Sequence, residues 1–176
     1  MKLSNGFSLL ESMVSITIMA IMLAIAIPGF QELVQSHKVK AITEDLLVAI
    51  QTARSHAVKD NRRVTLAADP TWEDGWIIFH DGNHDGDKDS EEALLLHADG
   101  VYDSVTIKGN RWVNDYISYL GTGESRWASG SRASAFQAGT INICPKEPGP
   151  GYALILARGG RLRKERIDAA KCANSP

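Results

Sequence analysis

Hydrophobic residues dominate the first part of the chain. Between Phe7 and Phe30 the only charged side chain is Glu11, and an apolar stretch of this length spans a bilayer as a single helix. An acid inside a membrane-spanning helix is unfavourable, by about 2.5–3.5 kcal/mol at the helix centre and by less near an end. Glu11 is therefore expected to have a function.

The helical pattern continues beyond the apolar stretch, up to about residue 59. Apolar residues recur there at helical spacing, namely Val39, Ile42, Leu46, Ala49, Ile50, Ala53 and Ala57. Charged and polar side chains occupy the other sides of this segment. One face is therefore expected to pack against the rest of the protein, and the helix is expected to end near Asp60 and Asn61.

Short alternating or apolar runs follow the helix and predict β-strands. The predicted strands are 64–68, 76–80, 93–98, 105–108, 117–120, 140–144, 152–157 and 162–167. Together they predict an α+β fold, in which a long N-terminal helix, half transmembrane and half amphipathic, packs on antiparallel β-sheet. Arg158-Gly159-Gly160 separates the last two strands, and glycine tolerates positive φ, so these strands are expected to form a hairpin.

Length and cysteine content fit one anchored domain. The chain has 176 residues and a net charge of -2, which suits a single globular domain after the apolar stretch. Cys144 and Cys172 lie in the last third of the chain, and in an exported domain they are expected to form one disulfide that holds the C-terminal tail. A metal site is less favoured, because two thiols without a CxxC or a nearby CxxH motif are too few.

A short leader, residues 1–6, precedes the apolar stretch and ends in a small residue, Gly6. A secretory signal peptide is cut after its apolar region, whereas this candidate cleavage site lies before it, so the helix would stay on the mature protein. The run Gly6-Phe7-Ser8-Leu9-Leu10-Glu11 resembles the prepilin cleavage signature of type IV pilins and type II secretion pseudopilins.

This resemblance implies that a prepilin peptidase cuts after Gly6 and methylates the new N-terminal amine of Phe7. Residues 7–30 would then be the membrane anchor and later the filament core, and residues 31–176 a periplasmic globular domain that includes the helix up to about 59. The Glu11 carboxylate is expected to pair with the Phe7 amine of a neighbouring subunit and so to set the axial register of assembly. The expected location is the inner membrane, as a single-pass protein, and then a pilus at the cell surface.

The middle of the chain contains three looser patterns. They are Ala-Arg-Ser-His-Ala-Val at 53–58, Arg-Val-Thr-Leu at 63–66, and Trp72 followed by Gly-Trp-Ile-Ile-Phe at 75–79. Followed by a turn rich in Asp and Gly, they resemble the GspH/FimT branch of minor pilins and pseudopilins. With the N-terminus, this resemblance covers most of the chain.

The acidic turn 81–92 fits the spacing of an EF-hand calcium loop. Its candidate oxygen ligands are Asp81, Asn83, Asp85, Asp87 and Glu92. The segments on both sides are predicted as strands rather than helices, and runs of Asp, Asn and Gly are also typical of hairpin turns. Calcium is therefore the less favoured interpretation, zinc at His80 and His84 is less favoured still, and no cofactor is expected.

The C-terminal segment is locally basic. Arg161 and Arg163 are predicted on one face of the last strand, about 6.6 Å apart at roughly 3.3 Å per residue. Two guanidinium groups at that interval suit successive phosphates of a nucleic-acid strand. Further cations near this pair are Arg158, Lys164, Arg166 and Lys171.

Gly160-Arg161-Leu162-Arg163 resembles the G-R-x-R motif of FimT-type minor pilins, which bind DNA during natural transformation. The resemblance implies Arg161 and Arg163 as the main DNA contacts, with binding that tolerates any sequence and weakens with salt. Other implied partners are pilin subunits, the prepilin peptidase and the inner membrane. Two alternatives remain: the arginines only keep an edge strand soluble, or the chain is a GspH-like pseudopilin, a structural subunit of a type II secretion pseudopilus without DNA binding.

The segment 121–139, rich in Gly and Ser, brings Arg126 and Arg132 as further candidates for the same surface. Trp127 offers a ring on which a base could stack, although packing inside the protein is its favoured role. The sequence contains no G-x-S-x-G, P-loop or dinucleotide motif. The chain is therefore not expected to be an enzyme.

Overall fold

Helix α1 extends from Leu9 to Asp60 in the computed structural model, which describes residues 8–100, 103–129 and 134–174. The predicted long helix is therefore confirmed, and it ends where Asn61 adopts a positive φ of 47°. At its start, the Ser8 hydroxyl accepts a hydrogen bond of 3.3 Å from the backbone N–H of Glu11, as in a capping box. Gly6 and Phe7, the predicted cleavage and methylation residues, lie outside the described residues.

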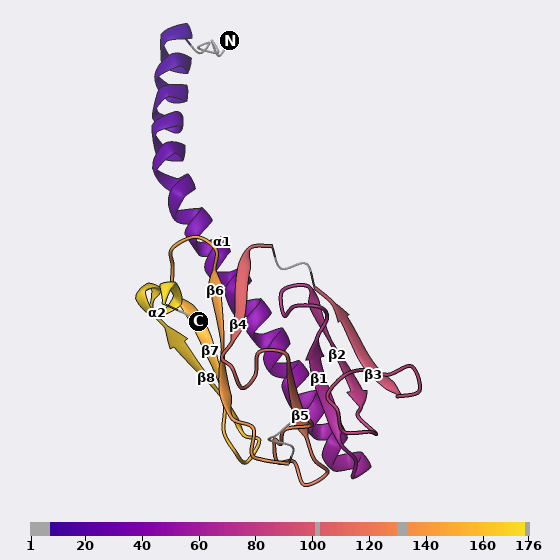
Figure 1. Cartoon of the computed structure of the whole chain (residues 1–176). Coiled ribbons are helices and arrows are strands. Elements are labelled where there is room, and N and C mark those ends of the chain that lie inside the picture. The colour runs from indigo at the N-terminus through magenta and orange to yellow at the C-terminus, as the bar shows by residue number, and fades with distance from the viewer. Residues whose placement is uncertain (1–7, 101–102, 130–133, 175–176) are drawn as a thin grey trace. The chain divides into compact units, whose positions relative to one another are not determined.

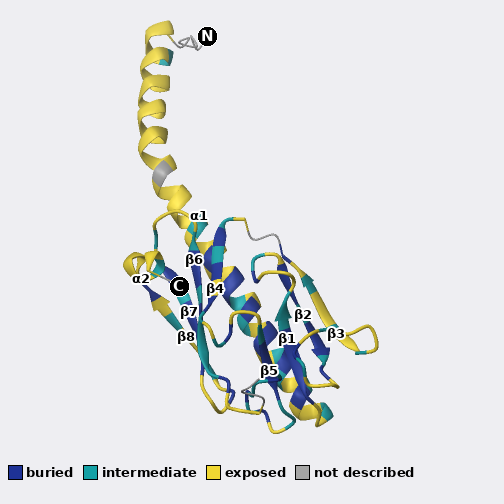
Figure 2. Cartoon of the chain, in the orientation of Figure 1, coloured by how far each residue is buried: buried dark blue, intermediate teal, exposed yellow. Residues whose placement is uncertain are grey.

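The chain divides into two compact units, one up to Gln35 and one from Ser36 onward. Among the described residues, α1 is the one helix long and apolar enough to cross a membrane, and none of its most apolar window is buried. The corresponding half of α1 is exposed in Figure 2. An uncovered apolar surface of this size marks a site for lipid or for other protein chains.

Two four-stranded antiparallel sheets form the second unit together with the remainder of α1 (Figure 1). The first sheet has the order β3-β2-β1-β5, with strands β1 (Val64–Ala68), β2 (Gly75–His80), β3 (Leu94–Asp99) and β5 (Tyr116–Tyr119). The second has the order β4-β6-β7-β8, with strands β4 (Val105–Gly109), β6 (Gly139–Pro145), β7 (Gly151–Leu156) and β8 (Leu162–Ile167). The predicted strands are confirmed to within one residue at either end, but their division into two sheets was not predicted.

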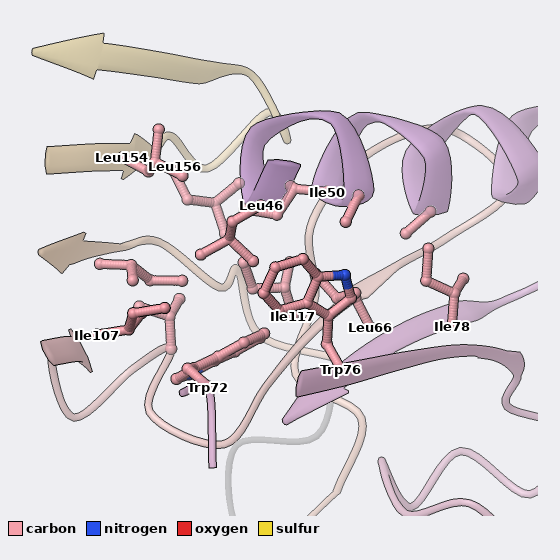
Figure 3. Packing of buried hydrophobic residues seen from close by; sticks show 14 of the residues in the cluster. Leu46, Ile50, Leu66, Trp72, Trp76, Ile78, Ile107, Ile117, Leu154 and Leu156 are labelled. Atoms are coloured by element: carbon pink, nitrogen blue, oxygen red, sulfur yellow. The ribbon is translucent and has the colours of Figure 1, made fainter. Parts of the chain in front are cut away.

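One hydrophobic core joins α1 to both sheets. Leu46 and Ile50 of α1 cluster with Trp76 of β2 and Leu154 of β7 (Figure 3), and all four are at most 2% exposed. Burying a large apolar side chain contributes roughly 1.5–3 kcal/mol, so this face of α1 holds the two sheets together. The predicted buried face of the helix is confirmed, because each of its predicted residues belongs to this core.

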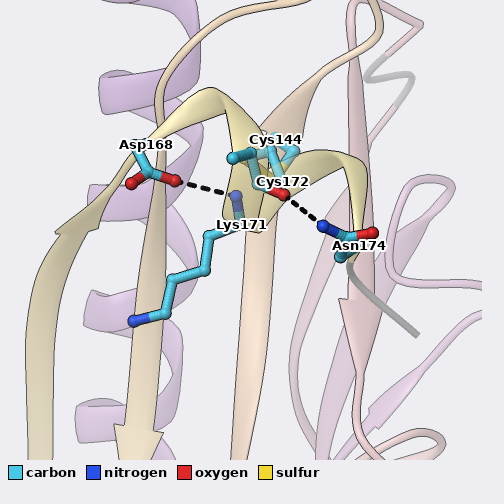
Figure 4. The surroundings of a disulfide bond; sticks show 6 residues. Cys144, Asp168, Lys171, Cys172 and Asn174 are labelled. Carbon is cyan, nitrogen blue, oxygen red and sulfur yellow. Dashed lines mark hydrogen bonds between the residues drawn. A yellow bond between two sulfur atoms is a disulfide. The ribbon is translucent and has the colours of Figure 1, made fainter.

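A short helix, α2 (Ala169–Ala173), follows β8 and was not predicted. Asp168 caps it by accepting a hydrogen bond of 2.8 Å from the backbone N–H of Lys171 (Figure 4). Cys172 of α2 is bonded to Cys144 of β6, which confirms the predicted disulfide. A helix this short is marginal by itself, so α2 depends on its cap and on the covalent link to the sheet.

Candidate functional site

The candidate nucleic-acid site is built on β8, an edge strand of the second sheet. In the pairing with β7, Arg163 lies opposite Ile155, whereas Lys164 lies opposite Leu154, which belongs to the core with α1. Side chains alternate between the two faces of a strand. Arg163 therefore lies on the face that points away from α1, which we call the outer face, and Lys164 lies on the face toward α1.

The ladder extends one residue pair beyond β8. The backbone N–H of Ala157 donates a hydrogen bond of 2.9 Å to the carbonyl of Arg161. The alternation that places Arg163 on the outer face places Arg161 there as well. Both side chains are exposed, so the structure agrees with the predicted common face of these two arginines.

The ion pairs of the outer face are exposed and weak. Arg163 contacts Glu165 at 3.2 Å, and Lys171 of α2 contacts the other oxygen of the same carboxylate at 3.7 Å. Exposed pairs contribute about 0–1 kcal/mol, so a phosphate can replace Glu165 as the partner of Arg163. Among the described residues, Arg161 has no side-chain hydrogen-bond or ion-pair partner.

The six predicted cations are divided between two faces. Lys164 pairs with Glu44 of α1 and lies 5.6 Å from the ring centre of Tyr152. Arg166 lies opposite Tyr152 and so shares this face. Lys164 and Arg166 therefore do not extend the surface formed by Arg161 and Arg163, because consecutive strand residues point in opposite directions.

Arg54 of α1 positions the turn between β7 and β8. Its Nε donates a hydrogen bond of 2.9 Å to the carbonyl of Gly123, and its Nη2 donates one of 3.3 Å to the carbonyl of Gly159. Gly160 has a positive φ of 73°, and a Cβ placed there would lie 2.2 Å from the Gly123 carbonyl oxygen. The turn that carries Arg158 and Arg161 is thus held against α1 and against the segment after β5. Sequence reasoning assigned Arg54 to the polar sides of the helix and missed this role.

Tyr119 of β5 adds a contact to the same turn. Its hydroxyl donates a hydrogen bond of 3.4 Å to the carbonyl of Gly160. Burial raises the pKa of Tyr119 well above its ordinary value, against a smaller opposing effect of Arg54. The hydroxyl therefore remains protonated and keeps its role as donor.

The outer face also has a hollow of about 300 Å³ between β4, β6 and α2. Lys108 and Lys146 line it, together with Asn142. The disulfide holds α2 over the adjoining strand, and Figure 4 shows α2 beside β6 at this place. These lysines put positive charge on the same face of the sheet as Arg161 and Arg163, and Glu147, which also lines the hollow, offsets part of it.

The acidic turn 81–92 forms internal hydrogen bonds. Asn83 donates to the carboxylates of Asp85 and Asp89 at 2.7 and 2.8 Å, and Glu92 accepts from the backbone N–H groups of Gly82 and Asp89 at 2.6 and 3.2 Å. The turn joins β2 to β3 rather than two helices. Among the described residues, no group of three or more His, Cys, Asp or Glu side chains could hold a metal ion. The candidate calcium ligands, including Asp87, therefore do not form such a group within the described part of the chain.

Asp81 belongs to a buried polar network. It is 1% exposed, and it accepts a hydrogen bond of 2.9 Å from the Thr65 hydroxyl. Arg63, also buried, donates to the Ser118 hydroxyl at 2.9 Å. Burial raises the pKa of Asp81 above its ordinary value, and nearby Glu92 adds to this, although Thr65 and Arg63 oppose it. Burial likewise lowers the pKa of Arg63.

Glu11 lies in the first turn of α1, within the apolar half of the helix, and its side chain is exposed. Another acid, Glu32, is exposed further along the same helix. The carboxylate of Glu11 is therefore free to meet a group from a neighbouring molecule, as the assembly prediction requires.

Two family descriptions match parts of this chain. The family described as type II transport protein GspH matches residues 43–160, and the prokaryotic N-terminal methylation motif matches residues 1–27. A fimbrial protein of Pseudomonas aeruginosa is 30% identical over 111 residues, which make up 62% of this chain and 71% of that protein.

The fold is shared with a solved structure. The type IV minor pilin FimU of Pseudomonas aeruginosa, strain PAO1, has been crystallised in two forms. One form has a TM-score of 0.57 at 23% identity and covers 80% of this chain and 93% of FimU. The other has a TM-score of 0.54 at 24% identity and covers 78% of this chain and 96% of FimU. At these identities the likeness establishes the architecture.

Proposed function

We propose that this chain, which belongs to the GspH family of type II transport proteins, is a minor pilin of a type IV pilus that binds DNA and supports DNA uptake in natural transformation. The family makes it a minor pilin or pseudopilin. The N-terminal methylation motif and the apolar half of α1 imply prepilin processing and a membrane anchor. The periplasmic orientation of the globular unit, cleavage after Gly6 and methylation of Phe7 are parts of the proposal.

The observation that carries DNA binding is the arrangement of Arg161 and Arg163. Both lie on the outer face of an edge strand, both are exposed, and Arg161 has no side-chain partner among the described residues. A guanidinium that is already desolvated and paired would lose those contacts on binding phosphate, whereas these two lose little. Arg54 and Tyr119 fix the preceding turn, which reduces the ordering needed on binding.

The other four predicted cations differ in how close they lie to the outer face. Arg158 in the turn and Lys171 on α2 flank the pair and are proposed as secondary contacts. Lys164 and Arg166 lie on the other face and can contact only DNA that wraps around the edge of the sheet. Because the contacts are to phosphates, we expect binding without sequence preference.

Salt titration of the full chain tests this proposal. Binding of a labelled DNA duplex is measured by fluorescence anisotropy in nonionic detergent at several salt concentrations. Each phosphate contact contributes about 0.9 to the slope of log affinity against log salt. The Arg161→Gln, Arg163→Gln variant should therefore bind more weakly, with a slope smaller by about two.

A matched control removes the same charge elsewhere. Lys38 and Lys40 are exposed on α1, and the Lys38→Gln, Lys40→Gln variant has the same net charge as the arginine variant. It should keep the wild-type affinity and slope. Equal losses in the two variants would mean that net charge alone, rather than the outer face of β8, governs binding.

A structural subunit of a type II secretion pseudopilus is the second candidate function. It is favoured by the description of the matching family as a type II transport protein and by the Glu165 carboxylate beside Arg163. In this case the arginines would keep an edge strand from pairing with other chains. Absence of salt-sensitive DNA binding in the titration would favour this function over DNA uptake.

A further inference from the structure

Arg126 and Phe136 face each other in the segment between β5 and β6, across an isolated antiparallel bridge. The Arg126 Cζ lies 3.7 Å from the centre of the Phe136 ring. The guanidinium is held in place, because it donates hydrogen bonds of 2.7 Å to the Ser134 carbonyl and 3.0 Å to the Glu124 carboxylate. One face of the ring is thus covered by a fixed cation, while 46% of Phe136 remains exposed.

Phe136 differs from the other aromatic residues of the globular unit. Among the described residues from Ser36 onward, it is the only exposed Phe, Trp or Tyr side chain. Trp127, the ring that the sequence suggested for stacking, packs edge-on against Tyr116 at 5.7 Å and Trp112 at 6.1 Å. Trp127 therefore serves packing, and Phe136 is the described Phe, Trp or Tyr residue of this unit with the most surface open to a ligand.

The Arg126 and Phe136 pair lies beside the turn between β7 and β8, which carries Arg158 and Arg161. A single hydroxyl, Ser125 Oγ, donates to the carbonyl of Gln137 at 2.7 Å and approaches that of Ala157 at 3.3 Å. Gln137 follows Phe136 in the chain, and Ala157 precedes Arg158. The two segments are also in contact through Gly123 and Gly160, and Figure 1 shows them at the same end of the sheets.

The exposed Phe136 ring and the nearby arginines are the two features that a binding site for single-stranded nucleic acid needs. Aromatic rings stack on bases of any sequence, and neighbouring cations hold the phosphates. We propose that Phe136, supported by Arg126, stacks on an unpaired base of single-stranded DNA whose phosphates contact Arg158 and Arg161. The inference rests on the proposed DNA binding and specifies the form of DNA that the site prefers.

Base pairing decides which form of DNA can use this ring. In the interior of a duplex each base is covered on both faces by its neighbours, so Phe136 cannot stack there without unstacking a base pair. An unpaired base presents a free face. Stacking on one aromatic residue changes affinity by about five-fold to 150-fold, and the effect adds to the phosphate contacts that both forms share.

The test compares labelled oligothymidine with a duplex of equal length, both titrated with the full chain in nonionic detergent. The Phe136→Leu variant should lose at least about five-fold in affinity for oligothymidine, with an unchanged salt slope and unchanged duplex affinity. The Phe136→Trp variant keeps a ring and should keep oligothymidine binding. Leu94→Ala, which shortens another exposed side chain, 51% exposed on β3, should behave as wild type.

Two results would overturn the inference. One is wild-type binding of oligothymidine by the Phe136→Leu variant, and the other is an equal loss for both forms of DNA. Neither result contradicts the proposed function, because in both cases the wild-type chain still binds DNA through its arginines. Failure of the wild-type chain to bind either form would instead overturn the proposed function and this inference with it.

Discussion

At the scale of single residues, Asp81 is an acid that the fold buries although the turn around it is exposed. Its Oδ2 accepts the Thr65 hydrogen bond, and its Oδ1 has no hydrogen-bond partner within the described residues. An ionised carboxylate in this position loses hydration that its contacts do not fully replace. The result is a raised pKa for Asp81, which ties stability to pH.

The sign of this pH dependence follows from linkage. A raised pKa means that the folded state binds the Asp81 proton more tightly than the unfolded state. The stabilisation is complete below the unfolded pKa of about 3.9 and disappears as pH rises through the folded pKa. We therefore expect the free energy of unfolding of wild type, relative to Asp81→Asn, to fall from pH 3.5 toward pH 7, as measured by chemical denaturation.

The control for this measurement is Asp87→Asn in the same turn. Asp87 is exposed, so its replacement should leave the pH dependence of unfolding as in wild type. A difference between wild type and Asp81→Asn that stays constant with pH would contradict the role of burial at Asp81.

At the scale of elements, β8 is both an edge strand and the proposed binding strand. Edge strands present unpaired backbone groups, and charged side chains keep such edges from pairing with other chains. Arg161, Arg163 and Lys164 give β8 this protection. The same exposure leaves the outer-face arginines accessible to phosphates, so the two roles do not conflict.

The disulfide is the second feature at this scale. It closes a loop with a sequence separation of 28 between Cys144 and Cys172, and a bridge of this kind contributes about 2–4 kcal/mol. Reduction should lower the free energy of unfolding of wild type by about that amount, measured by urea denaturation with and without reductant. Hydrogen exchange in α2 should also become faster, because a helix of this length is marginal without the bridge.

The Cys144→Ala, Cys172→Ala variant is the control for the reductant. Its stability should match that of reduced wild type and should not respond to reductant. If wild type were equally stable in both redox states, the bridge would not be what holds α2 to β6.

At the scale of the whole molecule, the two units have opposite relations to water. The globular unit buries its apolar side chains in a main core and in a smaller cluster around Cys144, whereas the apolar half of α1 leaves its side chains exposed along its length. Lipid first and neighbouring helices later are the partners that such a surface fits. A carboxylate within this surface needs a cation in the assembled state.

Assembly should therefore depend on Glu11. The Glu11→Gln variant removes the charge without changing shape and should enter sheared pili at a small fraction of the wild-type level, measured by immunoblot. Glu32→Gln removes an exposed acid from the same helix and should assemble normally. Mass spectrometry should find the chain cleaved after Gly6 in both variants, so that a defect reflects assembly rather than processing. Wild-type incorporation of Glu11→Gln would rule out the proposed pairing with Phe7.

Much of the fold could be predicted because its signals are local. The helix from Leu9 to Asp60 follows from a continuous apolar stretch and then from helical spacing, and the strands follow from short alternating runs bounded by Gly, Asp and Asn. The division into two sheets could not be predicted, because strand order depends on contacts between residues far apart in the chain. Helix α2 was missed because its stability comes from Asp168 and from the bridge to β6.

The candidate site, like the fold, could be predicted only in part from the sequence. A strand has a period of two residues, so the sequence alone determined that Arg161 and Arg163 share a face. It grouped Lys164 and Arg166 with them only by their nearness in the chain, and the pairing of β8 with β7 separated them. Only the tertiary structure decided which face points away from α1, that Glu44 pairs with Lys164, and that Arg54 holds the turn. It also brought the segment that contains Phe136 beside the turn that carries Arg158. These outcomes depend on contacts between segments that are far apart in the chain, and a local pattern of residues does not predict such contacts.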